Sequence, residues 1–306
     1  MLQSIKTSNL TWHNLIKPAA RDLEYLSRNF NFHPLDLEAS RKDRHSQRPQ
    51  ISEYEKYIFL ILLFPIYRRR QRDIKPAEID FFLGKNYLIT IHNNELEPLK
   101  KMFNLNRDDL TAREKFIKNS SSELLYDILN KLFLYCFPML DHISLDIANI
   151  ENNIWQGKEK AMTKEILIIQ RNIINFRKIM QAHKNVMKKI VAGRNPLVAD
   201  NIKKYFSSIV EQSKDIWDIL ENQKDTIYAL HHTNESLISF KLNDIMKTLT
   251  IFSVIVFPLT LLAALFGMNT INMPLITHPY GFWIIISIMA GGVFLMFAYF
   301  KHKKWI

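Results

Sequence analysis

The chain has 306 residues and a formal net charge of +11 at pH 7, from 41 lysines and arginines and 30 aspartates and glutamates. Its single cysteine, Cys136, excludes an internal disulfide and a metal site built from several thiolates of one chain. Most basic residues alternate with acidic ones along predicted helices, so nucleic acid is not expected as a partner. Two denser basic clusters, 68–72 and the C-terminal lysines, are interpreted as a solvated loop and a lipid-facing anchor.

Residues 1–118 are predicted to form a cytoplasmic α+β domain. The start of the chain lacks a basic segment followed by an apolar stretch of signal-peptide length, so we expect this domain to stay in the cytoplasm. Apolar runs typical of strands occupy 57–64, 79–83 and 87–92. Gly84-Lys85-Asn86 separates the last two runs and predicts a hairpin turn. Helical spacing follows at Leu96, Leu99 and Phe103.

The segment 119–197 is predicted to be a cytoplasmic helical pair. The spacing of Ser120 and Glu123 fits a capping box. The first helix is predicted from Ser121 to Gln156, with Pro138 inside it. The second is predicted from about Thr163 to Val191, ended by Gly193 and Pro196.

A stalk helix is predicted over 198–247, continuous with a membrane helix. Asp200 is a suitable N-cap. Between Asp200 and Phe266 there is no glycine and one proline, Pro258, so one uninterrupted helix is expected over 200–266.

From Thr248 to Phe300 the chain contains no Asp, Glu, Lys or Arg. A membrane span needs about 20 apolar helical residues, so we predict a first transmembrane helix at 248–267, an external loop at 268–281 and a second transmembrane helix at 282–300. The basic tail 301–306 places the C-terminus in the cytoplasm, and two spans return the N-terminus to the same side. The expected location is the cell membrane.

Two helices cannot enclose a water-filled path, so a pore requires several copies of the chain. Steps of three and four residues along the first span define a stripe of small and polar residues with interspersed apolar ones. The stripe consists of Asn243, Met246, Leu249, Ser253, Phe257, Thr260, Ala264 and Gly267. In the alternative interpretation, the hydroxyl groups only bond back to their own helix and the small residues only permit close packing.

Several segments resemble the CorA family of divalent-cation channels over nearly the whole chain. In the membrane region they are 245–251, 257–260, Phe266 followed by Gly267-Met268-Asn269, Met273-Pro274 and the terminus 299–305. Further matches are 82–90 and 135–138.

The resemblance implies a funnel-shaped homopentamer in which five copies of the first span line the pore and the second span forms an outer ring. It implies transport of Mg²⁺, with Co²⁺ or Ni²⁺ as further cargo, through a selective mouth made by Gly267, Met268 and Asn269. Mg²⁺ is then both substrate and regulatory ligand, and no organic cofactor is expected. The expected partners are further copies of the chain, divalent cations and the lipid bilayer.

Neutral Asn269 oxygens are suited to holding the hydration shell of Mg²⁺, which gives up water reluctantly. No P-loop signature occurs, and the membrane potential supplies the driving force for passive uptake. Family members close when cytoplasmic Mg²⁺ bridges carboxylates of neighbouring subunits.

The regulatory positions depart from the family pattern. Ser208 stands where an aspartate of the sensing site is common, and Glu211, one turn further on, is the candidate replacement. His231 and His232 stand where relatives often carry an acidic residue. His232 is a candidate ligand for a softer metal ion or a pH-sensitive group, and solvated helix histidines are the simpler interpretation. The outer loop also lacks an acidic residue after Met273-Pro274.

Two other functions remain open at this stage. One is a proton-coupled zinc or broad transition-metal transporter of the same superfamily, assisted by His231, His232 and His278. The other is a membrane-anchored sensor or scaffold without transport. An enzyme is not expected, because no nucleophile elbow or metal-hydrolase spacing appears.

Overall fold

A computed structural model describes residues 2–41, 48–117, 120–268, 275 and 278–305, without the side chains of 115 and 116. The chain forms two compact units, Met1–His231 and His232–Ile306. Each unit is described here by itself. The finer division into seven segments stays a prediction.

A six-stranded sheet forms the centre of the first unit, with strand order β1-β2-β6-β5-β4-β3. The pair β2 and β6 is parallel, and the other neighbours are antiparallel. The strands are β1 (Leu2–Lys6), β2 (Thr11–Ile16), β3 (Gln50–Glu53), β4 (Tyr57–Arg68), β5 (Asp73–Gly84) and β6 (Tyr87–His92). The three predicted strands and the turn after Gly84 are confirmed. Strands β1, β2 and β3 are not predicted from the sequence, because they are short and mixed in polarity.

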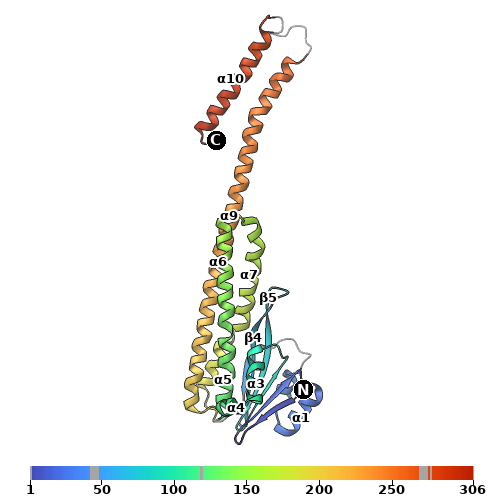
Figure 1. Cartoon of the computed structure of the whole chain (residues 1–306), viewed down its shortest axis with the longest axis vertical. Coiled ribbons are helices and arrows are strands. Elements are labelled where there is room, and N and C mark those ends of the chain that lie inside the picture. The colour runs from blue at the N-terminus through green and yellow to red at the C-terminus, as the bar shows by residue number, and fades with distance from the viewer. Residues whose placement is uncertain (1, 42–47, 118–119, 269–274, 276–277, 306) are drawn as a thin grey trace. The chain divides into compact units, whose positions relative to one another are not determined.

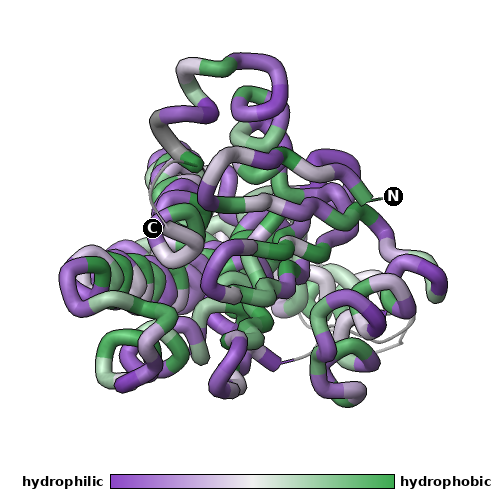
Figure 2. The backbone as a smooth tube through the Cα atoms, turned by 90° about the horizontal axis from the view of Figure 1, so that it is seen from below, coloured by the Kyte–Doolittle hydropathy of each residue, from purple (hydrophilic) through white to green (hydrophobic). Residues whose placement is uncertain are grey.

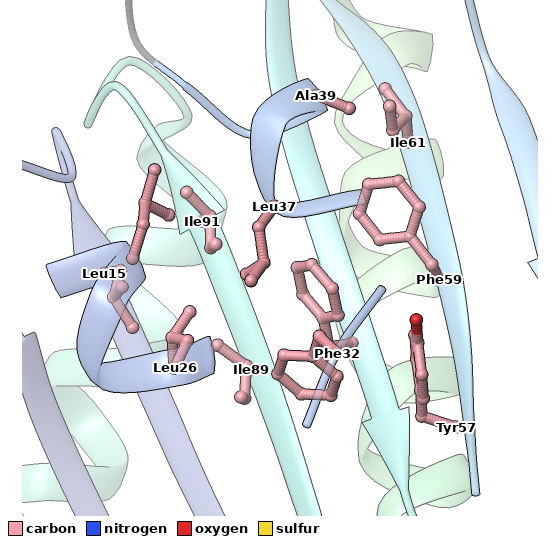
Figure 3. Packing of buried hydrophobic residues seen from close by; sticks show 12 residues of the cluster. Leu15, Leu26, Phe32, Leu37, Ala39, Tyr57, Phe59, Ile61, Ile89 and Ile91 are labelled. Carbon is pink, nitrogen blue, oxygen red and sulfur yellow. The ribbon is translucent and has the colours of Figure 1, made fainter. Parts of the chain in front are cut away.

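Strand β4 reads as a continuous apolar run because both of its faces are covered. Tyr57, Phe59 and Ile61 contribute to a core under α1 (Ala20–Phe30) and α2 (Pro34–Ala39), as Figure 3 shows. The alternate residues face the other layer, where Phe64 meets Phe133 edge-on at 5.4 Å.

The other layer of this unit is helical. It contains α3 (Glu97–Asp108), α4 (Leu110–Phe116), α5 (Ser121–Leu134), α6 (Cys136–Trp155), α7 (Glu159–Met180) and α8 (His183–Ala192). Trp12 on β2 packs edge-on against Phe103 of α3, with ring centroids 5.0 Å apart. Hydrophilic and hydrophobic residues alternate at short intervals along most of the backbone in Figure 2, as expected for helices with one buried face.

The first predicted helix is two helices in the structure. Ser120 does cap α5, since its Oγ accepts a hydrogen bond from the Glu123 backbone N–H at 3.2 Å. The helix is then interrupted at Tyr135, between α5 and α6. Pro138 has no N–H to donate to the carbonyl of Leu134, four residues earlier, and this accounts for the interruption.

The second predicted helix is also wrong as a single element. It starts earlier, at Glu159, and divides into α7 and α8 at residues 181–182. This segment contains neither glycine nor proline, so local sequence gives no sign of the division. The break precedes His183, which is fully buried between the rings of Phe64 and Phe133, at centroid distances of 5.2 and 5.6 Å.

The continuous helix predicted over 200–266 is confirmed as α9 (Asp200–Phe266). The predicted cap is wrong, because Asp200 is the first helical residue. The Ala199 carbonyl accepts from the N–H groups of Ile202 and Lys203, and Asp200 forms an ion pair with Lys203 at 2.7 Å. An acidic residue in the first turn still interacts favourably with the helix dipole.

Replacing Asp80 on β5 with asparagine is expected to stabilise the protein at neutral pH. Asp80 is 2% exposed, and its Oδ1 has no hydrogen-bond partner among the described residues. Burial, with a smaller contribution from the Glu78 carboxylate, raises the pKa of Asp80 well above its ordinary value. The folded state therefore binds this proton more tightly than the unfolded state, and stability falls as pH rises above the unfolded pKa of about 4.

The measurement is the midpoint of thermal unfolding of the purified chain at pH 5 and pH 8. Asp80→Asn should raise the midpoint by several degrees at pH 8, at about 2–4 °C per kcal/mol, and by less at pH 5. Asp141→Asn, at an exposed position of α6, is the matched control. A rise in the unfolding midpoint that is equal at both pH values, or equal in Asp141→Asn, would contradict the conclusion that the buried Asp80 carboxylate destabilises the folded state at neutral pH.

Candidate functional site

The second unit contains the two helices that are long and apolar enough to cross a membrane. They are the C-terminal part of α9 and α10 (Gly281–His302), both seen in Figure 1. Many of their large apolar side chains are exposed in the isolated chain, including Phe252 at 65% and Phe294 at 73%. Apolar surface on this scale requires lipid or further protein to cover it.

The predicted pore stripe lies on one uninterrupted helix, because all of its residues up to Ala264 belong to α9. Ser253 is half-buried, and the other members are exposed within the single chain: Asn243, Met246, Leu249, Phe257, Thr260, Ala264 and Gly267. The stripe is therefore available to face a lumen or another copy of the chain, and its assignment as a pore lining stays a prediction.

The two hydroxyl groups of the stripe bond back to their own helix. Ser253 Oγ donates to the Leu249 carbonyl at 2.9 Å, and Thr260 Oγ1 donates to the Val256 carbonyl at 2.9 Å. This part of the alternative interpretation is confirmed. A hydroxyl that donates in this way still has its oxygen lone pairs, so it can accept hydrogen bonds from water.

Helix α9 ends at the predicted selectivity motif. The Gly267 N–H donates to the Ala263 carbonyl at 2.9 Å, and Met268, which is 53% exposed, donates to the Leu265 carbonyl at 3.3 Å. A Cβ at Gly267 would approach the Ala263 oxygen to 3.1 Å, so a side chain there would require the backbone at the helix end to move by a few tenths of an ångström. Asn269 lies outside the described residues.

The end of a helix is electrostatically suited to a cation. The last carbonyls of a helix lack intrahelical partners, and the macrodipole places partial negative charge at the C-terminus. The end of α9, at Phe266, offers this charge without any carboxylate between Thr248 and Phe300.

The opposite end of the two membrane helices is basic and aromatic. Trp305 stacks on Phe300 with ring centroids 5.8 Å apart, and Lys247 Nζ lies 3.5 Å from the Lys304 carbonyl oxygen. Lysine and tryptophan at this position are typical of a membrane–water interface. The sequence analysis assigned no role to Lys247, whose contact with the tail joins residues that lie far apart in the chain.

The structure brings no metal centre together from the predicted regulatory residues. Ser208 and Glu211 are exposed on α9, and Ser208 Oγ donates to the Tyr205 carbonyl at 2.7 Å. His232 is exposed, with Nδ1 3.6 Å from Glu235 Oε2. In the part of the chain that the structure describes, no group of three or more His, Cys, Asp or Glu side chains is arranged to hold a metal ion.

These features define a class of protein: a membrane protein with two transmembrane helices, an α+β unit and one long helix that contributes to both units. The family is shown by a match of residues 7–302 to the model for "CorA-like Mg2+ transporter protein". The chain belongs to this family.

Named relatives and solved structures agree with the match. The chain is 26% identical over 304 residues to the cobalt/magnesium transport protein CorA of Thermotoga maritima, covering 98% of this chain and 84% of that protein. It is 26% identical over 306 residues to the putative metal ion transporter YfjQ of Bacillus subtilis, and the match covers 99% of this chain and 93% of that protein. The structure of the CorA magnesium transporter from Methanocaldococcus jannaschii matches this structure with a TM-score of 0.84 at 20% sequence identity. The match covers 99% of this chain and 94% of that chain.

The chain is therefore a transporter of Mg²⁺ and related divalent cations of the CorA family, and the CorA-like fold is confirmed. The matching solved structure is only 20% identical in sequence, so this match supports the fold alone.

Proposed function

We propose that the protein is a passive channel that takes up Mg²⁺, and also Co²⁺ or Ni²⁺, under the membrane potential. Five copies surround a central pore, with α9 lining it and α10 outside. The observation that carries this proposal is the uncharged, exposed stripe of α9 that leads to Gly267, Met268 and Asn269. The protein resides in the cell membrane with both termini in the cytoplasm, in agreement with the basic tail after α10.

Selection occurs at the mouth. Five Asn269 amide oxygens and the carbonyls at the ends of five α9 helices accept hydrogen bonds from the water shell of the ion. Mg²⁺ keeps most of its waters at such a site, because neutral acceptors hold the hydrated ion without dehydrating it. The absence of carboxylates from 248–300 keeps binding weak enough for release on the cytoplasmic side.

The lone pairs of Ser253 and Thr260 extend this path along the stripe. Their hydroxyl hydrogens are fixed toward the backbone, so the oxygens act as acceptors for water hydrogens. Asn243 provides a further polar station. Met246, Leu249 and Phe257 form apolar constrictions that close when water leaves them.

The driving force needs no nucleotide hydrolysis. A divalent ion moving inward gains about 4.6 kcal/mol per 100 mV of membrane potential, which corresponds to a concentration ratio of roughly a thousandfold or more. Closure must therefore be controlled, and cytoplasmic Mg²⁺ serves this role through acidic contacts between subunits. Glu211 is the proposed contributor, since Ser208 replaces the usual carboxylate.

The test is flux into liposomes that contain the purified protein, with Mg²⁺, Co²⁺, Ni²⁺ and Zn²⁺ in competition and an imposed membrane potential. We expect Mg²⁺ entry that rises with inside-negative potential and falls when Mg²⁺ is placed inside. Mass measurement of the complex should give five chains. A monomer, or a complex closed to every metal after internal Mg²⁺ is chelated, contradicts the channel. Zinc uptake that depends on a pH gradient supports the proton-coupled alternative.

A further inference from the structure

The tip of the β4–β5 hairpin is fixed against α7 (Figure 1). Arg72 forms a two-bond ion pair with Glu165, with Nη1–Oε1 and Nη2–Oε2 distances of 3.0 and 2.5 Å. The carbonyl oxygen of Arg72 also accepts from Arg171 Nη2 and Asn172 Nδ2, each at 3.1 Å. The hairpin tip is therefore held in place by the side chain and the carbonyl oxygen of Arg72.

The remaining arginines of this cluster differ in their partners. Arg68 lies 3.4 Å from the Glu95 carboxylate. Among the residues that the structure describes, no carboxylate forms an ion pair with Arg69 or Arg70. Arg69 and Arg70 are both exposed, but Arg69 is among the residues that line a cavity and Arg70 is not. The prediction of a solvated loop agrees with the exposure of 68–72, but Arg72 is bound to α7 and Arg69 lines the cavity.

The cavity has a volume of about 480 Å³ and lies between the hairpin tip, the start of α6 and α7. Its inner wall is apolar, with Ile74, Ile143 and Ile169 all buried. Asn172 joins the wall to the hairpin, since its Oδ1 accepts from the Ile74 N–H at 3.3 Å. The walls are thus held together before any ligand arrives, which lowers the entropy lost on binding.

The rim of the cavity carries aromatic and charged groups. Tyr67 and Tyr135 come from different elements, Tyr67 from β4 and Tyr135 from the junction of α5 and α6. Arg69 supplies a guanidinium, and His142 and Asp146 of α6 supply an imidazole and a carboxyl group. A volume of this size is within the range of small-molecule sites, which combine apolar walls with a few polar groups.

We propose that this cavity binds a nucleoside phosphate. The planar base lies against the apolar wall and the tyrosine rings, the phosphates meet the Arg69 guanidinium beside His142, and Asp146 accepts hydrogen bonds from base N–H or ribose hydroxyl groups. Guanidinium is the preferred side chain for phosphate oxygens, because its fork of donors matches them. A free inorganic anion would use Arg69 alone and leave the aromatic rim without a function.

The experiment measures binding to the full-length purified protein by isothermal titration calorimetry. The probes are ATP, with and without Mg²⁺, and adenosine and pyrophosphate as the two separate halves. We expect ATP to bind at least about 10-fold more tightly than either half. Arg69→Gln should weaken ATP binding about 10- to 100-fold, since a hydrogen bond to a charged group contributes about 1.5–3 kcal/mol.

The neighbouring Arg70→Gln is the matched control and should change affinity by less than about twofold, since it removes the same charge outside the cavity. Asp146→Asn should change the preference among ATP, GTP and CTP, and Asp141→Asn should not. The proposal is overturned if ATP binds no better than pyrophosphate, if Arg70→Gln weakens binding as much as Arg69→Gln, or if no nucleotide binds. The cavity is lined by residues of the first unit, whereas the proposed pore stripe belongs to the second, so ion flux in liposomes tests the channel with different residues.

Discussion

Asn269→Ala is expected to reduce Mg²⁺ flux by about 100-fold or more. One substitution removes an acceptor from each of five subunits at the proposed mouth, and each hydrogen bond contributes about 1 kcal/mol, so several lost together correspond to at least two decades in rate. The measurement is uptake into liposomes at a fixed inside-negative potential, with the mass of the complex checked for each variant.

His278→Ala is the control for Asn269→Ala, because His278 belongs to the same predicted external loop but lies outside the proposed selectivity motif. It should leave Mg²⁺ flux within about twofold, because the His278 ring accepts a hydrogen bond from the Tyr280 backbone N–H at 3.2 Å and has no role in the proposed Mg²⁺ mouth. If Asn269→Ala transports as well as the unmodified chain, the mouth is not where ions are selected. If neither Asn269→Ala nor the unmodified chain transports Mg²⁺, a membrane-anchored sensor or scaffold becomes the better interpretation.

Leu249→Ser is expected to produce a channel that cytoplasmic Mg²⁺ no longer closes. Leu249 is exposed on the stripe at 59%, one turn before Ser253 on α9. In the proposed pore, five leucines at one level exclude water and thereby stop ions, whereas five serines are smaller and hold water. Flux at an internal Mg²⁺ concentration that stops the unmodified channel should then approach the flux seen without internal Mg²⁺.

Leu262→Ser is the matched control, since Leu262 lies on the opposite side of α9 from the stripe by helical spacing. Serine is tolerated within membrane helices, so both variants should assemble. Closure by internal Mg²⁺ should persist in Leu262→Ser. Equal loss of closure in both variants would mean that general loosening of the helices, and not a local constriction, explains the result. Retained closure in Leu249→Ser would remove Leu249 from the gate.

The gating proposal depends on contacts that one chain does not contain. Ser208 and Glu211 are exposed, and the described part of the chain forms no metal centre by itself. Both observations are consistent with a regulatory site that takes carboxylates from two subunits. Closure by internal Mg²⁺ can therefore be compared directly between Glu211→Gln and the unmodified chain in the same flux assay.

The sequence by itself determined the membrane segments and the long helix. The charge-free run 248–300 and the continuous helix over 200–266 are properties of consecutive residues, so length and composition are sufficient to find them. The same holds for the apolar strands β4, β5 and β6, which are buried on both faces. The position of the proposed selectivity motif at the end of α9 also follows from the chain order.

Tertiary structure decided the features that depend on partners distant in sequence. Strand β2 pairs in parallel with β6, from Thr11 with Tyr87 onward. The division between α7 and α8 accompanies burial of His183 against Phe64, and the basic cluster meets α7 through Arg72 and Glu165. None of these contacts leaves a periodic pattern in the local sequence. Their energies come from groups about 90 to 120 residues apart in the last two cases, and only folding brings such groups within reach of one another.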